Sequence, residues 1–129
     1  MSGVRVVLDT TALTAYAQLK GMATAELVAL IAAEGGAELV GIPAACFLTA
    51  YEHLGPDERD RLVRPATGID GVTVILPLLG ADAVEVAERG PALGHAVVEA
   101  RRRDAYLATY AGPQARGLLG EGCVLDLDG

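Results

Sequence analysis

Short apolar runs alternate along the chain with longer segments whose apolar residues recur at helical spacing. The short runs are rich in Val, Ile and Leu and lack regular polar positions. That pattern is typical of strands buried on both faces of a sheet. Five strands are predicted on this basis, at residues 4–8, 38–41, 72–76, 106–109 and 123–127.

Caps, Pro and Gly mark helix boundaries between these strands. Thr10 or Thr11 can cap the first helix, and Gly35-Gly36 ends the second. Pro43 suits the first turn of the third. The predicted helices run from about residue 10 to 19, 24 to 34, 43 to 54, from 57 onward, 79 to 88 and 90 to 103.

Strands and helices that alternate in this way form a parallel sheet with helices on both faces. We therefore expect an α/β fold, with three α/β/α layers around a central, mainly parallel sheet of about five strands. The 129 residues fit one domain, 1–129, without repeats or linkers. In such sheets the working site lies beyond the carboxyl ends of the strands, so the residues after Leu8, Gly41, Leu76 and Thr109 are the ones to examine.

Composition narrows the function classes. Apolar residues make up 52% of the chain, but aromatic residues only 4%, so the core must be built from Ala, Val and Leu. The net charge of −7 argues against a large non-specific surface for nucleic acid, because such a body repels phosphate. The run Arg101-Arg102-Arg103 could form a local basic patch, although a solvated helix end is the commoner role for such a run.

The two cysteines, Cys46 and Cys123, show neither metal-ligand spacing nor a disulfide framework. Cys46 lies in an apolar run and is expected to be a buried thiol, which fits a reducing compartment. No signal peptide and no apolar stretch of membrane-spanning length are visible. We therefore expect a cytoplasmic protein.

Asp9 is the most distinctive polar residue at a predicted strand end. It closes the first strand and precedes a helix, with Thr10 and Thr11 beside it. A carboxylate there could hold a magnesium ion or orient a water molecule. It could equally cap the helix, because Asp is common at such positions. A phosphohydrolase of the haloacid dehalogenase type would need a second Asp where Thr11 stands, and the first strand is not followed by a Gly-rich phosphate loop.

Three segments resemble, in order, the motifs of the PIN-domain ribonucleases, a family that includes the VapC-type toxins. They read VVLDTTAL at residues 6–13, IPAACFLTAY at residues 42–51, and HAVVEA at residues 95–100 followed by YLAT at residues 106–109. The resemblance implies the three-layer fold above. It also implies cleavage of single-stranded RNA with magnesium or manganese, held by three or four carboxylates at the carboxyl edge of the sheet. Several anionic ligands are needed because one carboxylate cannot hold two divalent ions.

The family's acids are mostly absent at the matching positions. The first acid matches Asp9, and the resemblance places Thr49 where the second should stand. The third should precede the helix that contains His95, where Gly90-Pro91 is found. The fourth polar position falls on Tyr110-Ala111. One acid is therefore matched.

Two other acids could substitute for the missing ones. Glu52 lies three residues after Thr49, which turns it by about 300° and places it nearly one helical turn deeper. Asp82 follows the third strand and could approach the same edge. Glu99, Asp70 and Asp104 are expected to lie too far away or at the opposite end of the strands.

His95 and Glu99 are spaced i, i+4 and should face each other on one helix. Such a pair could bind metal or transfer protons. We expect a local hydrogen-bonded pair instead, because the sequence shows no third partner for a catalytic constellation.

The sequence favours a PIN-like domain that has lost its nuclease site and acts as a binding or regulatory module. Asp9 is then a remnant, Thr10, Thr49 and His95 are candidate binding residues, and no cofactor is expected. The resemblance to PIN-like toxins implies a homodimer, with a regulatory protein as a further partner. The alternative is an active ribonuclease that uses Mg or Mn on Asp9 with Glu52 or Asp82. A third class is a small-ligand binder.

Overall fold

Five strands form one parallel sheet in the computed structural model, which describes residues 3–35, 37–68 and 70–128. Their order is β3-β2-β1-β4-β5, so the first strand of the chain is the central one, and each neighbouring pair is parallel. The predicted strands are confirmed, with ends that differ by at most two residues. The strands are β1 (Gly3–Leu8), β2 (Glu38–Pro43), β3 (Thr73–Leu76), β4 (Tyr106–Thr109) and β5 (Val124–Asp126).

The six predicted helices are present, and a seventh was not predicted. The part of the chain that the structure describes contains α1 (Thr10–Ala17), α2 (Ala23–Ala32), α3 (Ala44–Glu52), α4 (Pro56–Ala66), α5 (Ala83–Arg89), α6 (Pro91–Arg103) and α7 (Gly112–Leu119). A short 3₁₀ turn, Gly80–Asp82, precedes α5. Of the pair Gly35-Gly36 expected to end the second helix, Gly36 lies outside the described residues.

The unpredicted helix α7 begins with Gly112 and Pro113 and contains Gly117. These residues have low helix propensity, so the local sequence does not resemble a helix. Packing against β5 and α6 stabilises the helix instead, because it buries Gly112 and Ala115 on the inner face.

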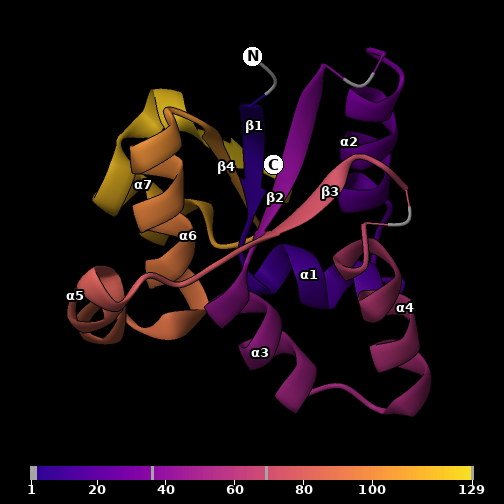
Figure 1. Ribbon diagram of the computed structural model, residues 1–129, viewed down its shortest axis with the longest axis horizontal. Helices are drawn as coiled ribbons and strands as arrows, with labels where there is room; N and C mark the ends of the chain where they lie inside the picture. The colour runs from indigo at the N-terminus through magenta and orange to yellow at the C-terminus, as the bar shows by residue number, and fades with distance from the viewer. Residues whose placement is uncertain (1–2, 36, 69, 129) are drawn as a thin grey trace.

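The helices cover the two faces of the sheet, and the three-layer α/β/α arrangement is confirmed (Figure 1). Helices α6 and α7 lie on one side, where α6 packs on β1, β2 and β4 and α7 packs on β5. Helices α1, α2 and α4 lie on the other side, where α2 packs on β2 and α4 on β3. Helix α3 starts at the carboxyl end of β2 and leads away from the sheet.

Small aliphatic side chains build the core, as the composition predicts. Val7, Val40 and Ile42 of the sheet are fully buried, and they belong to one apolar cluster with alanines of α1, α3 and α6. Small residues also allow close approach of helices: a Cβ added at Gly94 would lie 2.7 Å from the Val86 carbonyl oxygen, so glycine lets α6 contact α5. Within the described residues, no helix combines the length and apolar character needed to cross a membrane.

Candidate functional site

The carboxyl edge of the sheet holds Asp9 in a buried hydrogen-bonded network. Asp9 is only 1% exposed and is the N-cap of α1. Its Oδ1 accepts the backbone N–H of Ala12 at 3.0 Å and the hydroxyl of Thr11 at 2.6 Å. Its Oδ2 accepts the hydroxyl of Thr109, at the end of β4, at 2.6 Å. Three donors therefore occupy most of the roughly four acceptor positions that a carboxylate has.

The same network fixes the loop that follows β4. The Thr11 hydroxyl oxygen accepts the backbone N–H of Tyr110 at 2.9 Å, and the Thr109 hydroxyl oxygen accepts that of Ala111 at 2.8 Å. The two hydroxyl oxygens lie 3.2 Å apart. Because each hydroxyl directs its one proton at Asp9, neither has a free donor for a ligand.

Burial raises the pKa of the Asp9 carboxyl above its ordinary value, and the hydrogen bonds from Thr109, Thr11 and Ala12 oppose that rise. The described hydrogen bonds leave little of the carboxylate free for another ligand. The geometry around Asp9 is that of a satisfied structural cap.

The other acids predicted for this edge do not join Asp9. Glu52 is exposed on the last turn of α3, a helix of nine residues, so it lies about 12 Å along the axis from the helix start. Asp82 forms an ion pair with Arg102 of α6. Among the residues with a described position, no group of three or more His, Cys, Asp or Glu side chains is placed to hold a metal ion.

The candidate binding threonines also make internal bonds. The Thr49 hydroxyl donates to the Ala45 carbonyl one turn earlier in α3, at 2.8 Å. The Thr10 hydroxyl donates to the Cys46 carbonyl at 3.4 Å and so links α1 to α3. Both hydroxyls therefore donate to backbone carbonyls of the protein rather than to a ligand.

Asp126 is an acid at this edge that the sequence analysis did not consider. It ends β5 in register with Thr109, so Asp9 and Asp126 stand on either side of Thr109. Its Oδ2 lies 3.4 Å from Arg116 Nη1 and against Gly112, at the start of α7. The signal was available, because the predicted fifth strand already placed Asp126 near its carboxyl end.

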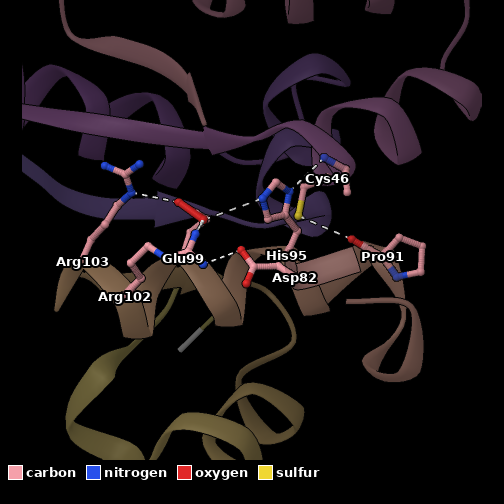
Figure 2. A network of polar contacts seen from close by, with 8 residues as sticks. Cys46, Asp82, Pro91, His95, Glu99, Arg102 and Arg103 are labelled. Carbon is pink, nitrogen blue, oxygen red and sulfur yellow. Dashed lines mark hydrogen bonds and ion pairs between the residues drawn. The ribbon is translucent and has the colours of Figure 1, made fainter. Parts of the chain in front are cut away.

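A second polar cluster, which we call the α6 cluster, consists of Asp82, His95, Glu99, Arg102 and Arg103 (Figure 2). The Glu99 carboxylate is 1% exposed and lies between two arginines that the sequence analysis expected to be solvated. Arg102 Nη1 donates to its Oε2 at 2.7 Å, and Arg103 Nε donates to its Oε1 at 2.9 Å. Arg102 also binds Asp82, so one guanidinium joins the 3₁₀ turn before α5 to α6.

His95 is fully buried and links α6 to the start of α3. Its Nδ1 accepts the backbone N–H of Ala45 at 3.1 Å, which places the proton of the neutral ring on Nε2. Nε2 lies 3.9 Å from Glu99 Oε2 and has no hydrogen-bond partner among the described residues. The prediction of a hydrogen bond between His95 and Glu99 is therefore wrong. The two groups face each other, but the distance of 3.9 Å between Nε2 and Oε2 is too long for a hydrogen bond.

Burial lowers the pKa of His95, and the nearby Glu99 and Asp82 carboxylates oppose that shift. The expected buried state of Cys46 is confirmed. Burial raises the pKa of its thiol to about 12, and its Sγ donates to the Ala92 carbonyl at 3.4 Å. A neutral imidazole and a protonated thiol make this region structural in character.

A scan against models of protein families matches no family, and a search of curated proteins finds no matching relative.

Proposed function

We propose that this chain is a PIN-like domain without metal-dependent nuclease activity that acts as a binding or regulatory module. The observation that carries the proposal is the state of Asp9: it is buried, and its carboxylate accepts three internal hydrogen bonds. Metal-assisted cleavage of a phosphodiester needs several carboxylates that converge on divalent ions.

The threonines support this proposal further. Thr49 occupies the position that the family resemblance assigns to the second acid, and its hydroxyl is turned back onto its own helix. The charge of −7 also disfavours RNA as the bound molecule, because few cations are left to neutralise phosphates. A protein partner, in the manner of a toxin–antitoxin pair, fits this charge better. The proposal also includes a cytoplasmic homodimer, which would have to form through a face other than the most acidic one.

The test compares the wild-type chain with Asp9→Asn and with a double variant, Thr49→Glu/Ala111→Asp, that restores two acids at the sheet edge. Each protein is titrated with MnCl₂ or MgCl₂ while its Tm is followed, and each is incubated with labelled single-stranded RNA. A metal site stabilises the folded state by linkage. We expect no metal-dependent rise in Tm and no cleavage for the wild type and for Asp9→Asn, and a rise in Tm for the restored variant.

Metal-dependent cleavage by the wild type that Asp9→Asn abolishes would overturn the proposal in favour of an active ribonuclease. Size measurement over a range of concentrations tests the homodimer separately. A monomer at every concentration contradicts that part.

A further inference from the structure

An open apolar groove runs between α2 and the neighbouring edge of the sheet. One cavity of about 390 Å³ is lined by side chains of α2, β1, β4 and β5, and a second, of about 420 Å³, continues it toward the start of α2. The two cavities share Leu27, Leu30 and Leu125. The groove therefore extends along α2, beside a helix of ten residues.

Within the residues that the structure describes, no helix covers the position of the groove on this face of the sheet. Consecutive strand residues point to opposite faces, so Asp126, which lies against α7, faces away from the groove that Leu125 lines. Both faces of a parallel sheet are normally covered by helices. On the α2 side, α4 packs on β3, α2 on β2, and α1 on β1 and β4, whereas β5 is covered by α7 on the other side.

The exposed side chains in this groove are large and apolar. Leu30 is 62% exposed and Tyr106 is 44% exposed, and Leu27, Leu125 and Leu127 are half-buried beside them. Leu27 and Leu30 recur at helical spacing along α2, so they present a stripe against which a second helix can pack.

Charge distinguishes between possible occupants. Glu26 and Glu34 of the α2 region border the groove. Among the described residues that line the groove, the arginine is Arg5, which is bound to Glu34 and Glu38. One positive and two negative charges leave this set with a net negative charge. Two copies of a chain with a charge of −7 would bring these acidic borders together, which opposes self-association through this face.

We propose that the groove binds an amphipathic helix of a basic protein partner, whose apolar side fills the space over β5 and the start of β4. Its Lys or Arg residues face Glu26 and the net negative set formed by Glu34, Glu38 and Arg5. This deepens the binding role proposed above, because it gives that role a surface and a class of partner. Such a docked helix covers the part of the sheet that the described helices leave open on this face.

The test uses the full chain and three synthetic peptides of about 15 residues, a length at which an isolated helix becomes marginally stable. One peptide has Leu at i, i+3, i+4 and i+7 with Lys elsewhere, the second replaces Lys with Glu, and the third scrambles the basic peptide. Binding is measured by fluorescence anisotropy at two salt concentrations. We expect the basic amphipathic peptide alone to bind, and more weakly at high salt.

Two matched variants locate the binding. Leu30→Gln removes an exposed groove residue, and Val84→Gln changes a residue of α5 that is 70% exposed on the other side of the sheet. Leu30→Gln should weaken peptide binding about tenfold, which corresponds to loss of one buried leucine contact. Val84→Gln should leave it unchanged. Because both residues are exposed, both variants should keep the wild-type Tm.

Three results would overturn the groove proposal: equal binding of the acidic or scrambled peptide, equal effects of the two variants, or a dimer that Leu30→Gln dissociates. The last result would assign the groove to a second copy. None of them affects the metal and RNA test, so a failure of this inference can be told apart from a failure of the proposed function.

Discussion

The Thr109 hydroxyl donates a hydrogen bond of 2.6 Å to Asp9 Oδ2, although the two residues are 100 positions apart in the sequence. Both side chains are buried. A buried carboxylate that loses one donor keeps the full cost of its desolvation, so this bond contributes more than an exposed one does.

Thr109→Val should therefore lower the free energy of unfolding by about 1–3 kcal/mol, because valine keeps the shape and removes the donor. Thr109→Ser, which keeps the hydroxyl, is the matched control, and its free energy of unfolding should decrease less. Urea unfolding at neutral pH measures both. A Val variant as stable as the wild type would show that the bond contributes nothing to folding.

Asp9 should make stability depend on pH. Burial raises its pKa in the folded state above the ordinary value of 3.8, so the folded state favours the protonated form. The resulting stabilisation is fully present below the unfolded pKa and is lost as pH rises through the folded pKa. Asp9→Asn should remove this slope, and it should lower stability at neutral pH because its NH₂ group cannot accept the hydrogen bonds that both Asp9 oxygens accept. Unfolding curves measured from acid to neutral pH provide the comparison, and an unchanged slope in Asp9→Asn would assign it to another group.

Glu99→Gln should destabilise the protein by about 2 kcal/mol, because it weakens two charge-assisted hydrogen bonds to a buried acceptor. Glu85→Gln is the control. Glu85 also binds two arginines, Arg89 and Arg101, but on the surface, where water screens the pairs. Equal losses in the two variants, measured by thermal unfolding, would mean that burial adds nothing to the α6 cluster.

His95 should make the protein less stable in mild acid. Its pKa is lowered in the folded state, so the stability that it contributes is complete above its ordinary value of 6.5 and falls as pH decreases below it. Protonation also places a proton on Nδ1, opposite the Ala45 N–H that it accepts. His95→Gln should reduce the decrease in the free energy of unfolding between neutral and mildly acidic pH. His53→Gln, a substitution at an exposed histidine, is the control and should leave this decrease unchanged.

Gly112→Ala should destabilise the junction of α7 and β5. A Cβ at this position would overlap Asp126 Oδ2 and lie 2.7 Å from its Cγ. Overpacking of this kind costs about 1–3 kcal/mol. Adding Asp126→Ala should recover part of the loss, which a double-mutant cycle detects. Strict additivity of the two substitutions would exclude the overlap as the cause.

The strands and their order along the chain could be predicted because each is a local run of β-branched or aliphatic residues with clear boundaries. Asp9 could be placed for the same reason, since it follows the first of these runs. The hydrogen-bond partners of Asp9 could not be predicted, because Thr109 is brought next to Asp9 only by the pairing of β1 with β4. That pairing is a property of the whole sheet.

The α6 cluster shows a different limit. Arg102 and Arg103 end a helix, and such residues are usually solvated, so their sequence gives no sign that Glu99 is buried beneath them. Glu99 is buried because α6 packs against α3, α5 and the sheet. Helix α7 was missed because its glycines suppress the local signal while tertiary contacts determine the outcome.

The central position of β1 has a consequence for how the chain folds. On one side, β1 pairs with β2, which begins about thirty residues after β1 ends. On the other side, β1 pairs with β4, which begins only at Tyr106. During synthesis the exposed edge of β1 therefore stays unpaired until most of the chain has emerged. Contacts between such distant segments slow folding and leave open strand edges available for aggregation. We expect the rate of refolding to be set by the docking of β4 beside β1.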